Sequence, residues 1–431
     1  MKVTFYIILL SLVVLLNACN TANRMPNSIE ELVEVQAPDQ EAIEKLRLIE
    51  RGQELAHKYI ITDGHVDLPY RLRVQNFRLE KEFLEIPIQT DKGDFDYVRA
   101  REGGLDAPFM SIYLPADYQK DPGRSKILAD SLIDMIVGIT EKHPDKFEVA
   151  YYPDDLRRLF KEQKIALPMG MENGSGLEDD LKNVAYFAER GINYITLTHS
   201  KDNLICDSSY DTTRTWMGLS PFGYEVIQEM QQQGIMIDVS HISDSTFYQV
   251  MRKVDVPVIA SHSSCRKFTP GFERNMSDDM IRKMGENGGI IMINFGSTFI
   301  DQKVKDDRAE MRIKLKELLE SKGLTRDDEA AKPVIDVFNE NNLTFSDVKV
   351  VADHIDHVVS LAGVDHVGFG SDYDGVGDSL PTGLKDVSDY PNLLTELLER
   401  GYSEKDIEKI CSGNLLRVWG KVEAYAPGNG K

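Results

Sequence analysis

Histidines and carboxylates recur in this sequence where apolar runs end. The members of this set are His65, Asp67, Glu172, His199, His241, His262 and Asp372. Side chains two residues apart on a strand point to the same face, so His65 and Asp67 can approach one ion together. Imidazoles and carboxylates without a thiolate suit zinc, with manganese or iron open on the same grounds. The pattern predicts a metal site.

The number of candidate ligands bears on how many ions the site holds. One catalytic zinc usually takes about three protein ligands and keeps one position open. Even three of these histidines with one aspartate and the glutamate exceed that number. Such a set suits two ions that share a bridging carboxylate and hold a hydroxide between them. Taken singly, each residue has a plainer explanation: Asp63 could cap a turn, Asp67 could cap a helix beginning near Pro69, and Glu172 could be a turn residue.

The apolar runs that carry these residues alternate with segments of helical spacing. The predicted strands are Tyr59–Asp63, Phe109–Leu114, Ile165–Met171, Tyr194–Thr198, Ile235–Ser240, Val256–Ser261, Gly289–Phe295 and His366–Gly370. Predicted helices between them include Leu181–Arg190, Phe222–Gln233 and Ser277–Asn287. Eight strands with intervening helices predict an α/β fold, a closed (β/α)₈ TIM-like barrel. Barrel enzymes build their sites at the carboxyl ends of the strands, which is where these polar residues lie.

Residues 300–344 depart from this alternation, because they are highly charged and helix-prone. We expect a helical insertion between the seventh and the last strand. Its charges are typical of a solvated surface, and a lid or a subunit contact is the alternative. The rest of 41–425 is expected to form a single catalytic barrel domain.

The N-terminal residues predict a signal for export of the protein. An early lysine, an apolar run and Leu16-Asn17-Ala18-Cys19 resemble a bacterial lipoprotein signal, with 1–18 as signal peptide and Cys19 as lipidation site. Residues 19–40, polar with prolines, predict a flexible tether. The expected location is the bacterial cell envelope, on a membrane through the lipid, in the periplasm or at the outer surface. An ordinary signal anchor with a chance cysteine is the alternative.

The composition bears on which partners and ligands the chain can bind. A formal net charge of −21 argues against nucleic acid, because phosphate binding needs a basic face. Beyond Cys19 the chain has Cys206, Cys265 and Cys411, which allow at most one disulfide and form no Cys-x-x-Cys metal pattern. Sulfur is therefore not expected as a ligand.

Several motifs together resemble the membrane (renal) dipeptidase family, whose members are zinc-dependent barrels of the amidohydrolase type. They are Arg99-Ala100-Arg101-Glu102-Gly103-Gly104, Gly64-His65-Val66-Asp67-Leu68-Pro69, Leu197-Thr198-His199-Ser200, Gly218-Leu219-Ser220-Pro221-Phe222-Gly223, Ile237-Asp238-Val239-Ser240-His241, Ser261-His262-Ser263-Ser264 and Val367-Gly368-Phe369-Gly370-Ser371-Asp372-Tyr373-Asp374-Gly375. The resemblance extends over about 45–420. Two departures are Val66, where relatives often carry asparagine, and Asn173, where they usually show glycine.

The resemblance implies a role for each residue in a dipeptidase that acts through a metal-bridging hydroxide. His65 and Asp67 would bind a first zinc, His241 and His262 a second, and Glu172 would bridge the two. His199 would polarise the scissile carbonyl or stabilise the tetrahedral intermediate, Arg274 would pair with the substrate's terminal carboxylate, and Asp372 would move the proton. Small dipeptides are the expected substrates, and a homodimer stays open.

Two other functions fit the same residues. The nearest is hydrolysis of N-acyl or D-amino acid amides on the same metals, because fold and ligands would be the same. A non-catalytic lipoprotein that binds peptides is the other, although every expected ligand is present.

Overall fold

A computed structural model describes residues 40–74 and 87–427 of the chain. The predicted signal peptide (1–18), Cys19 and all of the predicted tether except Gln40 lie outside the described residues. The chain divides into two compact units, 1–47 and 48–431. Within the described ranges, every helix is too short or too polar to cross a bilayer.

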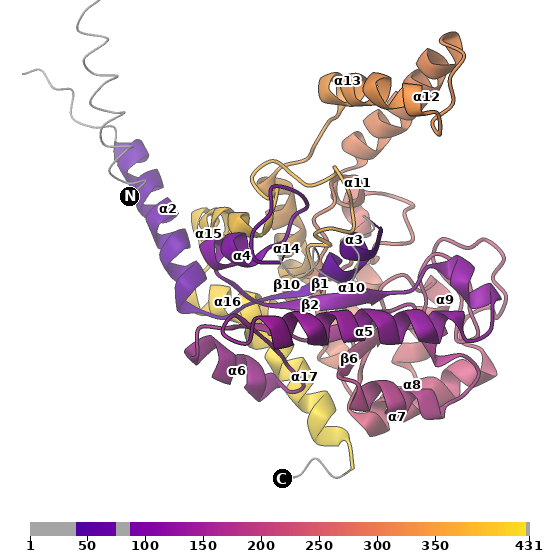
Figure 1. The fold of residues 1–431 in the computed structure, drawn as a ribbon. Coiled ribbons are helices and arrows are strands. Elements are labelled where there is room, and N and C mark those ends of the chain that lie inside the picture. The colour runs from indigo at the N-terminus through magenta and orange to yellow at the C-terminus, as the bar shows by residue number, and fades with distance from the viewer. Residues whose placement is uncertain (1–39, 75–86, 428–431) are drawn as a thin grey trace, which may run out of the picture. The chain divides into compact units, whose positions relative to one another are not determined.

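Eight parallel strands form the central sheet of the second unit (Figure 1). In sheet order they are β1 (Ile61–Val66), β2 (Leu105–Tyr113), β5 (Met169–Glu172), β6 (Ile192–Thr196), β7 (Met236–Asp238), β8 (Ile259–Ala260), β9 (Ile290–Ile293) and β10 (Val367–Phe369). The order follows the sequence around the sheet, as in a (β/α)₈ barrel. The predicted fold class is confirmed, and each predicted strand overlaps one of these.

The first and last strands meet at their carboxyl ends. Asp372 N–H donates to His65 O at 3.1 Å, and Asp67 N–H donates to Tyr373 O at 2.8 Å. These contacts nearly close the barrel and bring the ends of β1 and β10 together. Gly64 of β1 also approaches Ser261, which follows β8: a Cβ there would lie 2.4 Å from Ser261 O, so only glycine fits at this position.

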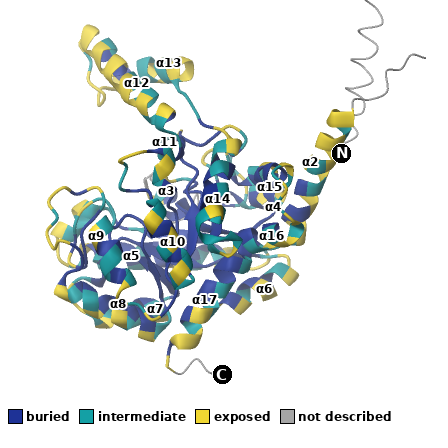
Figure 2. Cartoon of the chain, turned by 180° about the vertical axis from the view of Figure 1, so that it is seen from behind, coloured by how far each residue is buried: buried dark blue, intermediate teal, exposed yellow. Residues whose placement is uncertain are grey.

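Sixteen helices connect and cover the strands in the described residues. They are α2 (Gln40–Lys58), α3 (Leu68–Val74), α4 (Tyr97–Gly103), α5 (Arg124–Lys142), α6 (Pro153–Lys161), α7 (Lys182–Glu189), α8 (Pro221–Gln233), α9 (Asp244–Met251), α10 (Asp278–Asn287), α11 (Ser297–Ile300), α12 (Gln302–Ser321), α13 (Lys332–Asn342), α14 (Val348–Ala362), α15 (Tyr390–Glu399), α16 (Glu404–Glu408) and α17 (Asn414–Tyr425). Figure 2 shows buried strands inside and helices with exposed outer faces. The three helices named from the sequence are found as α7, α8 and α10.

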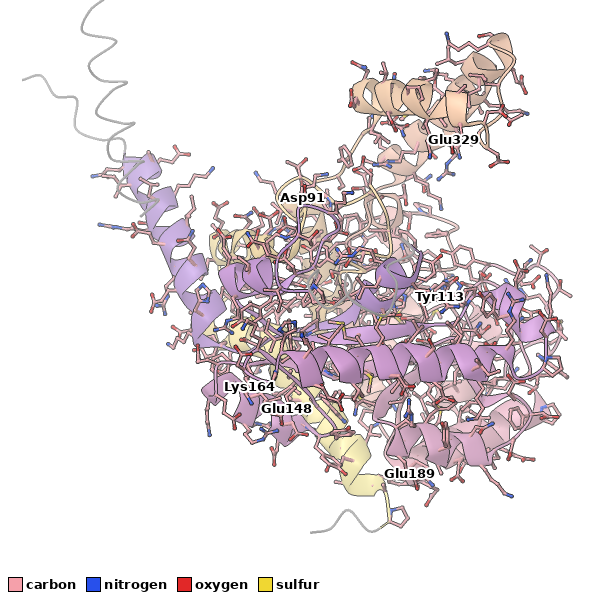
Figure 3. All side chains as sticks on the ribbon, in the orientation of Figure 1. Asp91, Tyr113, Glu148, Lys164, Glu189 and Glu329 are labelled. Atoms are coloured by element: carbon pink, nitrogen blue, oxygen red, sulfur yellow. The ribbon has the colours of Figure 1, made fainter. Side chains whose placement is uncertain are left out.

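Most predicted strand boundaries differ from the structure by one to four residues, and two of the differences are informative. The first strand does not end at Asp63 but continues to Val66, because Asp63 is buried and hydrogen-bonded. The third predicted strand breaks at Pro168, whose nitrogen has no hydrogen to give to a ladder. Its first half, β4 (Ile165–Leu167), pairs instead with β3 (Phe147–Val149), which was not predicted. Glu148 and Lys164, labelled in Figure 3, form an ion pair of 3.2 Å on this small sheet.

The insertion before the last strand is helical, as expected. Leu315 and Leu319 of α12 and Ala331, just before α13, form a small apolar cluster against which Val334, Ile335 and Phe338 of α13 pack, separate from the clusters of the barrel. The other residues of α12 and α13 are mostly exposed, as is Glu329 in the turn between them, labelled in Figure 3.

Candidate metal centre

The seven candidate residues of the sequence lie together at the carboxyl ends of the strands. His65 is within β1 and Glu172 ends β5, and the others follow β1, β6, β7, β8 and β10 directly. Three groups among them have ligand atoms within 4.8 Å of one another: His65, Glu172 and His262; Glu172, His199 and His241; and His65, Asp67 and Asp372. Such groups can each hold a metal ion.

Glu172 lies at the centre of this cluster, and its two carboxylate oxygens face different partners. Oε1 is 3.1 Å from His241 Nε2 and 3.3 Å from His262 Nε2. Oε2 is 3.5 Å from His65 Nε2, which is also 3.5 Å from Asp67 Oδ2. A carboxylate between two ligand pairs has the geometry of a bridging ligand.

Several buried atoms of this cluster have no hydrogen-bond partner among the described residues. They are His65 Nε2, Asp67 Oδ1, His199 Nδ1 and His241 Nδ1. A buried polar atom left unpaired costs about 1–3 kcal/mol, so four of them in one place require an explanation. Among them, His65 Nε2 faces Asp67 and Glu172, where a divalent cation would satisfy it, whereas His199 and His241 turn their Nε2 atoms, not these Nδ1 atoms, towards Glu172.

The electrostatics of the cluster favour metal-binding protonation states at three residues. Burial lowers the pKa of His241 and of His262 well below the usual value, and the charge of Arg274 adds to this. Burial by itself would raise the pKa of Glu172, but His65 and His199 outweigh it and hold that pKa well below its usual range. Neutral imidazoles and an ionised carboxylate are the forms that ligate metals. At His65, burial is outweighed by Tyr194, Glu172 and Asp67, which raise the pKa, and a bound cation would oppose that shift.

Asp372 occupies an unusual backbone conformation beside the cluster. Its φ is 64°, and His241 has a φ of 68°, both in the left-handed region that non-glycine residues rarely adopt. Asn294 Nδ2 donates to Asp372 Oδ2 at 2.7 Å. Burial raises the pKa of Asp372 to about 7. A carboxyl group with a pKa near neutrality suits proton transfer.

His199 stands at the edge of the same cluster. Its Nε2 is 3.6 Å from Glu172 Oε1, and its ring meets the edge of Tyr113 with centroids 4.8 Å apart. Tyr113, labelled in Figure 3, ends β2. The geometry allows two roles for His199, as a group facing a substrate or as a ligand with Glu172 and His241.

A pocket of about 490 Å³ opens over these residues. Besides the cluster it is lined by the aromatic side chains of Tyr70, Tyr113, Tyr210 and Phe299 and by Ser200, Gly375 and Val376. Its floor is thus polar and charged, whereas its walls are largely apolar, as in sites that bind small organic molecules.

Comparison with known proteins decides the family. The sequence matches the family described as membrane dipeptidase (peptidase family M19) over residues 49–430. The chain belongs to the membrane dipeptidase family.

Relatives in sequence and structure agree with this assignment. A protein named as an uncharacterised dipeptidase, C965.12, of Schizosaccharomyces pombe is 32% identical over 389 residues, which are 88% of this chain and 84% of the relative. The crystal structure of the probable dipeptidase PvdM from Pseudomonas aeruginosa is 26% identical with a TM-score of 0.74, over 88% of this chain and 99% of that one. A metallopeptidase structure from Rhodobacter sphaeroides, liganded with a phosphinate mimic of the dipeptide L-Ala-D-Ala, is similar in fold, at 22% identity and a TM-score of 0.69 over 84% and 99% of the two chains.

Arg274 of this dipeptidase-family chain is buried behind the pocket. It is 3% exposed, and its guanidinium donates to Ser263 Oγ and to His262 O, both at 2.7 Å, while Nη2 is 3.0 Å from His241 Nε2. Its Nε has no hydrogen-bond partner among the described residues. Arg274 therefore braces the segment that carries His262 and leaves one donor for another group.

Sequence reasoning missed the residues that hold the candidate ligands in place. Asp63 Oδ1 accepts from His65 N at 2.9 Å and from Ser371 N at 3.0 Å, and Tyr390 OH donates to its other oxygen. Asp63 thus joins β1 to the residues after β10 rather than capping a turn. Its partner lies some 300 residues away in sequence, so no local pattern could have shown this contact.

Asn173, where the resemblance leads us to expect glycine, has a backbone conformation that favours glycine. Asn173 has a φ of 80°, which glycine adopts freely and asparagine tolerates better than most residues. Its side chain accepts from Ser175 N at 3.2 Å and donates to Leu114 O at 2.9 Å. The side chain of Asn173 therefore fixes the turn after Glu172 with hydrogen bonds.

Proposed function

We propose that this chain hydrolyses dipeptides with two zinc ions held by His65, Asp67, Glu172, His241 and His262. The observation that carries the proposal is the position of Glu172, whose two oxygens face His65 on one side and His241 with His262 on the other. Five nitrogen and oxygen ligands without a thiolate suit zinc and exceed what one catalytic zinc takes.

Bound there, the ions would supply a water whose pKa is lowered to about 7, which makes a nucleophile available at neutral pH. The side chains of the chain do the rest. Asp372 takes a proton on its carboxylate and returns it to the leaving amine, held in place by Asn294. His199 faces the scissile carbonyl oxygen and stabilises the charge that develops on it. The free Nε of Arg274 attracts the terminal carboxylate of the dipeptide.

Metal content measured together with turnover tests the proposal. Protein purified with ample zinc is expected to hold two ions per chain by elemental analysis and to release both amino acids from a dipeptide. One ion per chain would contradict the bridging role of Glu172. Two ions without any hydrolysis would favour a non-catalytic peptide-binding lipoprotein.

A substrate panel separates dipeptides from related amides. The panel contains an L,L-dipeptide, an L,D-dipeptide and an N-acetylated amino acid, each followed by product detection. Dipeptides are expected to turn over fastest. Faster turnover of the N-acetyl compound would favour an N-acyl amide hydrolase on the same metals.

We also propose that Cys19 carries a lipid that holds the protein on a membrane of the bacterial cell envelope. The support is the order of an early lysine, an apolar run and Leu16-Asn17-Ala18-Cys19 in the sequence. Fractionation of cells that express the full chain is expected to place it with membranes, and Cys19→Ser is expected to release it with unchanged kcat/KM. Membrane retention of the variant would contradict the anchor.

A further inference from the structure

Tyr194 places a phenol hydroxyl deep inside the barrel. The residue lies on β6 and is fully buried, yet its hydroxyl meets β1, which is three positions away in the sheet. The hydroxyl is 2.9 Å from His65 Nδ1 and donates to Gly64 O at 3.0 Å. Its ring therefore crosses the interior from one strand to another that is not its neighbour.

The surrounding residues make room for this crossing. Phe109 of β2 stacks on the Tyr194 ring with centroids 5.5 Å apart. A Cβ at Gly170 of β5 would lie 1.9 Å from Cζ of Tyr194, so glycine is required there. Phenylalanine would fill this apolar space as well as tyrosine does, because the ring contacts do not involve the hydroxyl. The reason for a tyrosine must lie in what its hydroxyl binds.

The hydrogen-bond directions at the hydroxyl follow from its chemistry. A phenol has one hydrogen to donate, and Gly64 O can only accept, so that hydrogen goes to Gly64. The phenol oxygen must then accept from His65 Nδ1–H. With its hydrogen on Nδ1, the neutral ring carries its lone pair on Nε2, the buried atom that has no partner among the described residues and faces Glu172 and Asp67.

We infer that Tyr194 is a positioning residue that fixes the ring orientation and tautomer of His65 for metal binding. The inference rests on the proposed role of His65 as a zinc ligand. Outer partners of this kind typically change metal affinity by about 10–100-fold.

A second candidate ligand is held in a comparable way. His262 Nδ1 is 2.7 Å from Ser261 Oγ, which donates to Asp238 Oδ2 at 2.6 Å. Each predicted ligand pair thus contains one imidazole whose far nitrogen is held by a buried hydroxyl, and Tyr194 provides that hydroxyl for the pair of His65 and Asp67.

The test is the affinity of Tyr194→Phe for zinc, measured by competition with a chelator. The variant keeps the ring and removes only the hydroxyl, so we expect it to fold and to bind zinc about 10–100-fold more weakly at one of its sites. Tyr186→Phe is the matched control, because it removes a phenol hydroxyl that donates to Asp130 on the outside of the barrel. The control is expected to bind zinc as the parent does.

A spectroscopic signature separates positioning from a general loss of stability. In the zinc-loaded parent, the Nδ1 proton of His65 is expected as a slowly exchanging downfield NMR signal. In Tyr194→Phe it is expected to move upfield and to exchange faster, whereas in Tyr186→Phe it stays.

Two results would overturn the inference, and they differ in what they say of the proposed function. If Tyr194→Phe binds zinc within twofold of the parent while His65→Ala loses an ion, positioning by Tyr194 is wrong and the proposed ligands stand. If His65→Ala itself retains both ions, the ligand assignment fails, and the inference fails with it.

Discussion

The barrel mouth and helix α14 both contain buried histidines, and they differ in how the ring nitrogens are used. His65 at the mouth and His354 on α14 are each 0% exposed. His354 Nδ1 accepts from Cys265 N at 3.0 Å, and its Nε2 donates to Ile300 O at 2.9 Å. At the mouth, His65 Nε2 and His241 Nδ1 have no such partner among the described residues. The histidines of both regions are buried. What distinguishes a candidate metal-binding histidine from a structural one is a ring nitrogen without a hydrogen-bond partner.

Asp67→Ala is expected to have the largest effect among the variants at the barrel mouth. Removing this proposed ligand is expected to lower metal content below the proposed two ions per chain and to reduce kcat/KM by more than the ~100-fold that outer partners cost. Elemental analysis and dipeptide kinetics on the same sample measure both effects. A variant that binds two zinc ions normally would break the comparison, because the open Asp67 Oδ1 would then have no ligand role.

His199→Ala distinguishes the two roles that the geometry allows for this residue. We expect the metal content to stay at the parent level and kcat to fall by about 10²–10³-fold, the usual cost of losing one partner that stabilises the transition state. Loss of an ion would instead make His199 a ligand with Glu172 and His241.

Arg274→Ala is expected to have a smaller, selective effect. The parent should prefer a dipeptide over its C-terminal amide, and the variant should lose about 10–100-fold of that preference, the usual worth of a hydrogen bond to a charged group. Ser263→Ala is the matched control, because it frees Arg274 Nη1 without removing the guanidinium. Unchanged discrimination in Arg274→Ala would leave Arg274 only its bracing of His262.

His354 represents the structural histidines in this comparison. Replacing it should change the stability of the fold and leave catalysis unchanged. Burial lowers the pKa of His354 from 6.5 to about 4. Between these values the unfolded chain binds a proton that the folded chain does not, so this contribution is complete above pH 6.5 and is lost as pH falls towards 4. The loss amounts to about 3 kcal/mol of the free energy of unfolding.

His354→Gln removes this titrating group. Urea unfolding at several pH values from 7 to 4 is expected to show a shallower loss of stability in the variant than in the parent, with zinc content and kcat/KM unchanged near pH 7. Equal slopes in the two proteins would show that His354 is not the group responsible.

The sequence predicted what depends on local pattern. Runs such as Tyr194–Thr198 and Gly289–Phe295 are apolar and β-branched over several residues, so their strands were found, and their ends marked the candidate ligands. The small sheet of β3 and β4 was missed because three residues are too few to show a period and Pro168 breaks a run that appears continuous.

What could not be predicted are contacts between distant segments. Asp63 with Ser371, Asn294 with Asp372 and Tyr194 with His65 each join different strands or strand ends, so their distances depend on closure of the barrel. Tyr194 gave a weak signal, because a phenol hydroxyl on a strand expected to be buried needs a hydrogen-bond partner.

The left-handed backbone of Asp372 has a consequence for protein engineering. A non-glycine residue there gives up about 1 kcal/mol or more of folding free energy that glycine would keep. Asp372→Gly is therefore expected to melt at a higher temperature than the parent in calorimetry while turning over no dipeptide. Selecting this protein for heat resistance alone would favour chains that no longer work, and any stabilisation of the enzyme must be sought away from the barrel mouth.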